Sequence, residues 1–154
     1  MSAEEGKKAP DFTMQATGGR TVSLKAMKGR PFVLYFYPKA DTPGCTKEAC
    51  GFQEALPALG GLGIEVIGVS PDKLPAIEKF AAKYDLTFPL ASDPDNAAAT
   101  AYGVWVEKSM YGKTYMGIER STFLVGKDGK VAKAWRGVKV PGHVEAVAEA
   151  AKAL

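Results

Sequence analysis

The chain has 154 residues, of which 46% are hydrophobic and 24% charged, with a formal net charge of +3. This composition excludes a disordered or collagen-like chain, and the length predicts a single domain over residues 1–154. No apolar run approaches the roughly 18 residues that would cross a membrane, and the first residues lack the apolar stretch of a secretory signal, so we expect a cytoplasmic protein. The basic residues are dispersed, so we expect no nucleic-acid-binding face.

The strands are predicted from apolar and β-branched runs. A minor hairpin is expected at residues 11–14 and 21–24, flanking Gly18-Gly19. The continuous run at 31–37 is typical of a strand buried on both faces. Asp128-Gly129 predicts a tight turn between two later strands. The remaining strands are expected at residues 64–70, 121–125 and 131–135.

Helices are expected between these strands, at residues 42–59, 74–84, 96–102 and 142–154. Ser70 or Asp72 is expected to cap the second of them. The order β-α-β-α-β-α-β-β-α predicts parallel strands joined by crossover helices and a final antiparallel hairpin. We therefore expect an α/β fold, a thioredoxin-like three-layer sandwich with a central mixed sheet flanked by helices.

The segment that carries the chemistry follows the central strand and opens a helix at residues 37–50. Thr42 is a good N-cap residue, and Pro43 suits the first helical position. Cys45 then falls in the first turn, where backbone N–H groups lack helical partners and the helix dipole is positive. Both effects stabilise a thiolate, which is the reactive form of cysteine. Cys45 is therefore a candidate nucleophile.

Cys50, the only other cysteine, lies on the same predicted helix. An apolar stripe places Cys45 toward the core, together with Ala49, Phe52, Leu56 and Leu59. On an ideal helix, the Cα atoms of Cys45 and Cys50 are about 8.7 Å apart. A disulfide needs Cα atoms within about 7 Å. A bond between the two cysteines therefore requires the first turns of the helix to unwind, and Pro57 and Gly60-Gly61 weaken its far end.

Other interpretations of the cysteine pair fit the sequence less well. Two buried structural cysteines would not need Thr-Pro-Gly before the first of them at a helix start. A structural zinc site requires four ligands, and the one histidine, His143, is nearly one hundred residues away. His143 is expected to cap the last helix or to face solvent. A Cys-His hydrolase meets the same difficulty. A dithiol oxidoreductase would use Cys-x-x-Cys, whereas four residues intervene here.

These residues resemble the peroxiredoxin family, in particular its bacterioferritin-comigratory-protein branch, also called peroxiredoxin Q. The family motif Pro-x-x-x-Thr-x-x-Cys is matched by Pro38, Thr42 and Cys45. The resemblance covers nearly the whole chain and includes residues 102–105, 110–113 and 117–124. Within these segments, Trp105 and Tyr111 are interpreted as packing residues rather than substrate contacts.

The resemblance implies that Cys45 is the peroxidatic cysteine, which attacks a peroxide and becomes a sulfenic acid. It implies that Arg120 lies beside Cys45, stabilises the thiolate and polarises the departing oxygen. A guanidinium suits both tasks because its fixed charge carries several hydrogen-bond donors. Taken alone, Arg120 would be read as an exposed strand residue. Glu48 is expected to orient Thr42 or Arg120, or to be a solvated helix residue.

The resemblance implies substrate-binding roles for the residues around Cys45. Thr42 would hold the peroxide through its hydroxyl group, and the backbone N–H groups of Gly44 and Cys45 would complete a polar cradle. Pro38 would shield the thiolate from bulk water. Taken alone, Thr42 is simply an N-cap and Pro38 ends a strand.

The expected reaction is the reduction of hydrogen peroxide and organic hydroperoxides in antioxidant defence. The sulfenic acid at Cys45 would condense with Cys50, which the branch uses as its resolving cysteine, and thioredoxin or a similar dithiol would reduce the disulfide. No metal, haem or flavin is expected, and neither is a membrane or nucleic-acid partner; we expect a monomer. The alternatives are a non-catalytic redox sensor on the same fold and a thioredoxin-like disulfide reductase.

Overall fold

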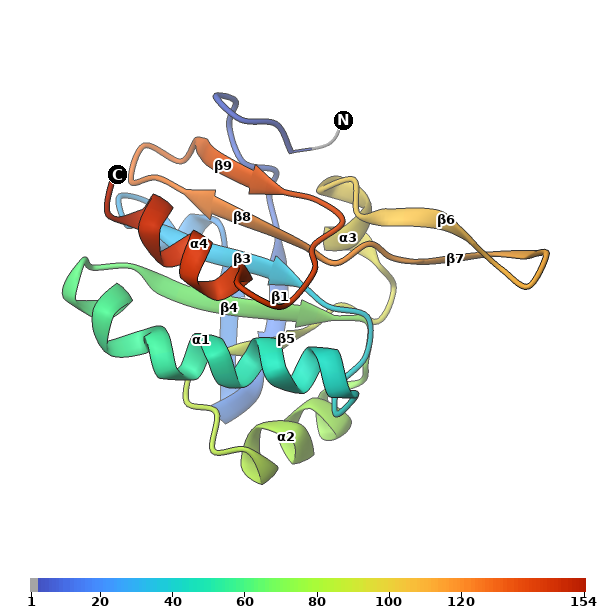
Figure 1. Ribbon diagram of the computed structural model, residues 1–154. Coiled ribbons are helices and arrows are strands. Elements are labelled where there is room, and N and C mark those ends of the chain that lie inside the picture. The colour runs from blue at the N-terminus through green and yellow to red at the C-terminus, as the bar shows by residue number, and fades with distance from the viewer. Residues whose placement is uncertain (1–2) are drawn as a thin grey trace.

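The computed structural model describes residues 3–154 and is built on one seven-stranded sheet (Figure 1). The strands lie in the order β2-β1-β5-β4-β3-β8-β9. Their bounds are β1 Thr13–Ala16, β2 Arg20–Ser23, β3 Phe32–Phe36, β4 Glu65–Ser70, β5 Leu90–Ser92, β8 Ser121–Val125 and β9 Val131–Trp135. β3, β4 and β5 run parallel, whereas β1, β2, β8 and β9 pair antiparallel with their neighbours. The sheet is therefore mixed, as predicted.

The direction of β8 differs from the expected succession of parallel strands. β8 runs antiparallel to β3, with Ser121 opposite Phe36 at the end of β3. The preceding helix, α3 (Ala97–Ala101), has only five residues. A return to the opposite edge of the sheet takes a crossover of a dozen residues or more. Here the chain makes no such return, and β8 starts at the edge where β3 ends.

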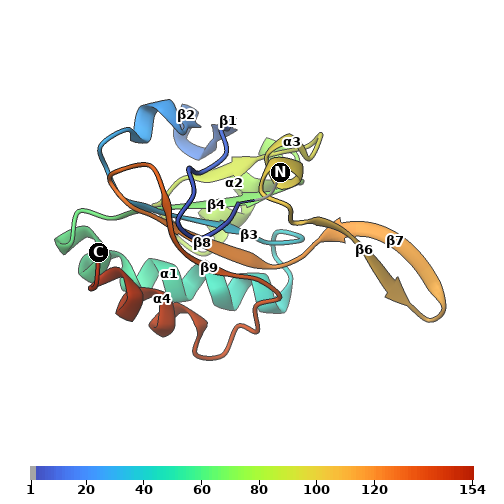
Figure 2. The ribbon, with the colours of Figure 1, turned by 90° about the horizontal axis from the view of Figure 1, so that it is seen from above.

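The helices form unequal layers on the two faces of the sheet (Figures 1 and 2). The first face is covered by three helices, α1 Pro43–Gly61, α2 Leu74–Lys83 and α4 His143–Ala151. The other face is covered by α3 and the segment before β1. Side chains of β3 alternate between these layers and are at most 1% exposed. Within residues 3–154, no helix is long and apolar enough to cross a membrane.

The structure adjusts the bounds of the predicted N-terminal hairpin and defines those of the strand that follows α2. The predicted hairpin appears as β1 and β2, joined by a 3₁₀ turn at Thr17–Gly19. The expected order of elements required a strand between the second and third helices, but the sequence suggested no bounds for it. β5 is that strand. Its three residues are too few for a recognisable apolar pattern.

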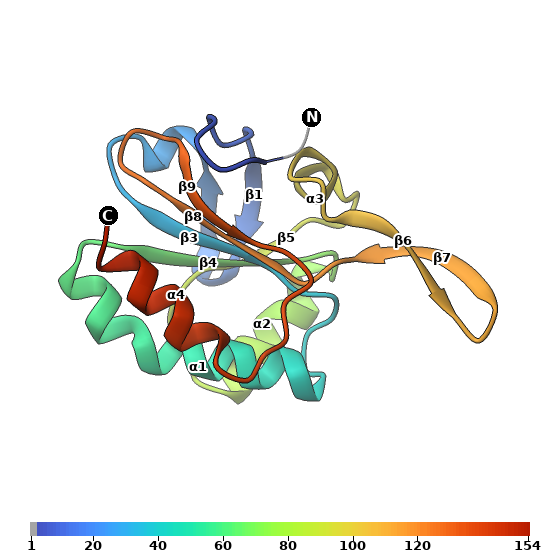
Figure 3. The ribbon, with the colours of Figure 1, turned by 45° about the horizontal axis from the view of Figure 1, so that its top comes forward.

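A two-stranded arm was not predicted. β6 (Trp105–Met110) and β7 (Lys113–Ile118) pair with each other and project away from the main sheet (Figures 1 and 3). Tyr111 and Gly112 form the turn, both with positive φ. Trp105 packs against the apolar core, as expected, but Tyr111 is 97% exposed, so its interpretation as a packing residue was wrong. Only the base of the arm is buried, at Ile118 and Trp105, and the rest packs on no core, which explains why its sequence carries no clear strand periodicity.

The predicted cap of α2 was also wrong. Lys73 occupies the N-cap position and makes no side-chain cap. The hydroxyl group of Ser70 instead donates to the Asp72 carboxylate, which also accepts the backbone N–H of Ala40 at 2.7 Å. These polar groups therefore join the end of β4 to the loop before α1.

Gly68 provides a test of this packing. A Cβ at this position in β4 would lie 2.7 Å from Leu90 Cδ2 and 2.8 Å from Tyr35 Cζ. We expect Gly68→Ala to lower the free energy of unfolding by about 1–3 kcal/mol, because overpacking forces these side chains to move. Gly61→Ala is the matched control, since a Cβ there meets nothing within 4 Å. Denaturant unfolding measures both, and equal midpoints for the two variants would contradict the prediction.

Candidate active site

A short loop joins the end of β3 to the start of α1 (Figure 1), and Cys45 lies just inside α1. α1 begins at Pro43 with Thr42 at the N-cap, so Cys45 falls in the first turn as predicted, and it is 2% exposed. The hydroxyl group of Thr42 does not cap the helix. It donates to the carbonyl oxygen of Lys39 at 2.8 Å. The N-cap position was therefore correct, whereas the expected side-chain cap was not.

The loop before Cys45 is held against α2. Asp41 has a left-handed backbone, with φ of 61°. Its carboxylate accepts from Lys83 Nζ at 2.9 Å and from the hydroxyl group of Tyr84 at 2.7 Å. Both partners lie at the end of α2, and with the Ala40–Asp72 bond they fix the position of the helix start. These contacts join residues far apart in the sequence, and no local pattern indicates them.

Arg120 is the residue just before β8, and its side chain reaches the sulfur of Cys45. Its Nη2 lies 3.1 Å from Cys45 Sγ, and its Nη1 lies 2.6 Å from Glu48 Oε1. Its side chain is 16% exposed, so the reading of Arg120 as an exposed strand residue is excluded. A Cβ on Gly44 would come within 3.3 Å of Arg120 Nη2. The absence of a side chain at Gly44 therefore lets the guanidinium approach the start of the helix.

Glu48 is fully buried and pairs with Arg120, which removes the alternative of a solvated helix residue. Burial raises the pKa of its carboxyl group to about 7, although the charge of Arg120 acts to lower it. Its second oxygen, Oε2, is buried without a hydrogen-bond partner in the described part of the chain. The sequence did carry a signal for this placement, because residues three apart on a helix share a face and Cys45 faces inward.

Cys50 is half-buried on the same unbroken helix, and neither cysteine is in a disulfide. Burial, with a smaller effect of the Glu54 carboxylate, raises the pKa of the Cys50 thiol. The continuous helix keeps the two cysteines at helical spacing, as expected. The apolar stripe is also confirmed: Ala49, Phe52 and Leu59 are buried and Leu56 is half-buried. The geometry therefore pairs a reduced, buried Cys45 with a thiol that it cannot reach without unwinding.

His143 contradicts its prediction. It starts α4, but it neither caps that helix nor faces solvent, because it is 6% exposed. Its Nε2 shares a hydrogen bond of 2.7 Å with the hydroxyl group of Thr122 on β8. Burial, and to a lesser extent the charge of Arg120, lowers the pKa of His143 to about 4. The ring is therefore a neutral, buried link between α4 and the strand that follows Arg120.

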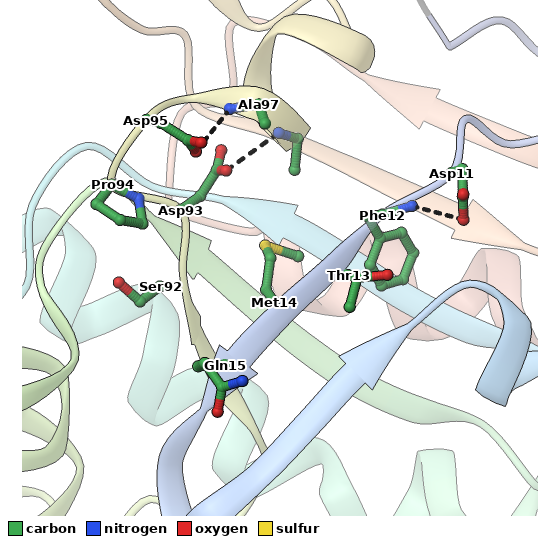
Figure 4. Close-up of a pocket in the computed structure, with 11 residues that line it drawn as sticks. Asp11, Phe12, Thr13, Met14, Gln15, Ser92, Asp93, Pro94, Asp95 and Ala97 are labelled. Carbon is green, nitrogen blue, oxygen red and sulfur yellow. Dashed lines mark hydrogen bonds between the residues drawn. The ribbon is translucent and has the colours of Figure 1, made fainter.

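A cavity of about 480 Å³ lies elsewhere, between β1 and α3 (Figure 4). Neither Cys45 nor Arg120 lines it. The carboxylate of Asp93 there accepts the backbone N–H groups of Ala98 and Ala99, so its charge serves the start of α3. Among residues 3–154, no three His, Cys, Asp or Glu side chains form a group suited to a metal ion.

Known proteins are similar in sequence to this chain over most of its length. The family model described as the AhpC/TSA family matches residues 6–134. A protein named putative peroxiredoxin bcp from Coxiella burnetii is 50% identical over 147 residues, which are 96% of this chain and 97% of that protein. Peroxiredoxin Bcp from Bacillus subtilis is 49% identical over 144 residues, covering 94% and 92% of the two chains.

Solved structures are also similar to this chain over most of its length. Peroxiredoxin Q from Xanthomonas campestris superposes with a TM-score of 0.89 at 46% identity, covering 92% of this chain and 90% of that one. A cysteine-to-serine mutant of PrxQ from Xylella fastidiosa has a TM-score of 0.90 at 37% identity and covers 99% and 98%. The expected thioredoxin-like α/β fold and the resemblance seen in the sequence are thereby confirmed.

The shifted groups predict opposing effects of pH on stability. The native state holds more protons than the unfolded state at Glu48 between about pH 4.5 and 7, so this group makes stability fall as pH rises. At His143 the unfolded state holds more protons between about pH 4 and 6.5, so stability rises with pH. The two effects oppose each other in the native protein.

Between pH 4.5 and 6.5, we therefore expect the stability of Glu48→Gln to rise with pH more steeply than that of the wild type. We expect the stability of His143→Gln to fall with pH over the same range. Each effect amounts to up to about 3 kcal/mol at 1.4 kcal/mol per pKa unit. Denaturant unfolding at several pH values measures it. Glu54→Gln, on the exposed side of the same helix, is the control. Parallel pH profiles for the wild type and both buried-site variants would show that neither group titrates as described.

Proposed function

The chain belongs to the AhpC/TSA family and is a peroxiredoxin of the Bcp/PrxQ kind, and on this premise we propose that Cys45 is its peroxidatic nucleophile. A peroxiredoxin is a thiol peroxidase, so the chain is an oxidoreductase. One relative's structural study, from Xanthomonas campestris, concerns alkyl peroxide reduction. The observation that carries the residue assignment is the contact of 3.1 Å between Arg120 Nη2 and Cys45 Sγ in the first turn of α1.

In the first step the Cys45 thiolate attacks the terminal oxygen of the hydroperoxide. The O–O bond breaks, an S–O bond forms, and the alkoxide that leaves takes up one proton to become an alcohol, or water when the substrate is hydrogen peroxide. The sulfur is oxidised to a sulfenic acid and the peroxide is reduced. Arg120 favours this step because its charge stabilises the thiolate and then the negative charge that develops on the leaving oxygen.

The groups around Cys45 suit the binding of the substrate. The Thr42 hydroxyl group already donates to Lys39, so its lone pairs are free to accept the O–H of the peroxide. Thr46 is the residue whose N–H bonds to the Thr42 carbonyl, so the N–H groups of Gly44 and Cys45 precede the helical ladder and remain available as donors. Pro38 is half-buried and brings no donor that would hold water beside the sulfur.

In the second step we propose that the Cys50 thiol attacks the sulfenic sulfur. An S–S bond forms, the S–O bond breaks, and water leaves. α1 must unwind first, because both cysteines lie on it and their helical spacing is too long for a disulfide. Pro57 lies inside α1 and removes one helical hydrogen bond, which makes the helix easier to open.

A dithiol reductant completes the cycle by thiol–disulfide exchange, in which its two thiols are oxidised and Cys45 and Cys50 are reduced. We propose thioredoxin or a similar dithiol protein in this role. We also propose that residues 1–154 act as one monomeric domain in the cytoplasm, in antioxidant defence. The two-cysteine chemistry supports the reductant class, because an internal disulfide is the natural substrate of a dithiol.

Replacing each cysteine tests the cycle. We expect Cys45→Ser to abolish the consumption of hydrogen peroxide with a thioredoxin system, because the nucleophile is lost. Cys50→Ser should lose turnover with thioredoxin but keep it with small thiols, which can reduce the sulfenic acid directly. Full activity of Cys45→Ser would refute the nucleophile. Wild-type protein that consumes about one equivalent and stops would favour the redox sensor over the enzyme.

Hydrogen exchange tests the unwinding. We expect residues 45–56 to exchange faster in the disulfide form than in the reduced form, because their helical hydrogen bonds must open for the bond to form. β3 is the internal control, since its buried strand should be equally protected in both states. Equal protection of residues 45–56 in the two states would rule out local unwinding.

A further inference from the structure

One cation is shared by two acidic side chains at the start of α1. The guanidinium of Arg120 contacts Cys45 Sγ through Nη2 and Glu48 Oε1 through Nη1. Cys45 is 2% exposed and Glu48 is fully buried. A single positive charge neutralises one negative charge. If Cys45 and Glu48 were both ionised, the buried site would carry an uncompensated negative charge, which is costly in a low dielectric.

Within residues 3–154, no second cation acts on Glu48. In the described part of the chain, Arg120 is the one group whose positive charge lowers the pKa of Glu48. Tyr35 on β3 and Tyr37 just after it face the site as neutral phenols, because burial raises the pKa of each well above its usual value. From α4, His143 is near enough for the charge of Arg120 to lower its pKa, so it is neutral as well.

The contacts of Glu48 also favour its neutral form while Cys45 is a thiolate. Oε1 accepts from Arg120, but Oε2 is fully buried and has no partner within the described residues. A carboxylate with one unsatisfied buried oxygen loses the solvation of that oxygen entirely. A carboxylic acid places its proton on one oxygen and removes most of this cost. Geometry and burial therefore agree with the raised pKa of Glu48.

Resting on the proposed role of Cys45, we propose that Glu48 stores the proton that the leaving alkoxide takes up: it is neutral beside the Cys45 thiolate and ionises when the sulfur is oxidised. The step balances as thiolate, hydroperoxide and carboxylic acid giving sulfenic acid, alcohol and carboxylate. The O–O bond breaks, the S–O bond forms, and one proton passes from the carboxyl group to the alcohol. Before and after the step, Arg120 faces one negative charge, first on Cys45 and then on Glu48.

This assignment makes Glu48 the source of the proton and the residue that compensates the charge of Arg120, which it contacts directly, while it does not touch the sulfur. The oxidation of Cys45 would otherwise leave Arg120 without a counter-charge in a largely buried site. The ionised Glu48 supplies that counter-charge within the same hydrogen-bonded group. The stored proton also means that the chemical step needs none from solvent at a pH where Glu48 is protonated.

Proton uptake during one turnover tests the proposal. The reaction is stopped at the sulfenic acid with Cys50→Ser, and the full-length protein is mixed with tert-butyl hydroperoxide in weak buffer with a pH indicator. The 240-nm absorbance reports the thiolate beforehand. At pH 6 we expect a thiolate and almost no proton uptake per sulfenic acid formed, and at pH 8 we expect uptake approaching one. The double variant Cys50→Ser/Glu48→Gln should take up one proton at both pH values.

Several outcomes would overturn the proposal. Uptake of one proton at pH 6 by Cys50→Ser, uptake unaffected by Glu48→Gln, or no thiolate at pH 6 would each do so. If Glu48→Gln fails to fold, infrared difference spectra of Cys50→Ser replace it, and the proposal then requires the loss of a protonated-carboxyl band on oxidation. Failure to form any sulfenic acid at Cys45 would instead contradict the proposed function, so the two failures are distinguishable.

Discussion

The contact of Arg120 with both Cys45 and Glu48 is the interaction on which the rest of the site depends. It joins the first turn of α1 to the residue before β8, and it is buried enough for each charge to matter. The antiparallel direction of β8 makes it possible, because β8 starts at the edge where β3 ends. A parallel β8 would start at the opposite edge and carry Arg120 away from the sulfur.

α1 has two requirements that oppose each other. Its first turns bury Cys45, Glu48 and Ala49, and this order holds the sulfur against Arg120. The same order separates Cys45 from Cys50 by a helical spacing that no disulfide accommodates. A stable first turn favours attack on the peroxide, whereas a helix that opens favours the disulfide. Local stability is therefore part of the chemistry, and a delay in opening leaves the sulfenic acid exposed to a second peroxide.

Local patterns predicted most elements because short-range packing produces them. The buried run of β3, the turn at Asp128-Gly129 and the stripe of α1 all appear as expected. The side-chain caps did not, because Thr42 donates to Lys39 and Ser70 bonds to Asp72 instead. The β6–β7 arm was missed because only its base packs in a core, so most of its residues show no strand periodicity.

By itself, the sequence determined that Cys45 sits in the first turn of a helix after a buried strand, and that Cys50 follows on that helix at a distance which forbids a bond. Both follow from local geometry. Only the tertiary structure decided that Arg120 reaches the sulfur of Cys45 and that Glu48 is buried against Arg120. It also decided that His143 is a neutral side chain hydrogen-bonded to Thr122. These contacts join residues 21 to 75 positions apart, and strand direction and helix packing bring them together.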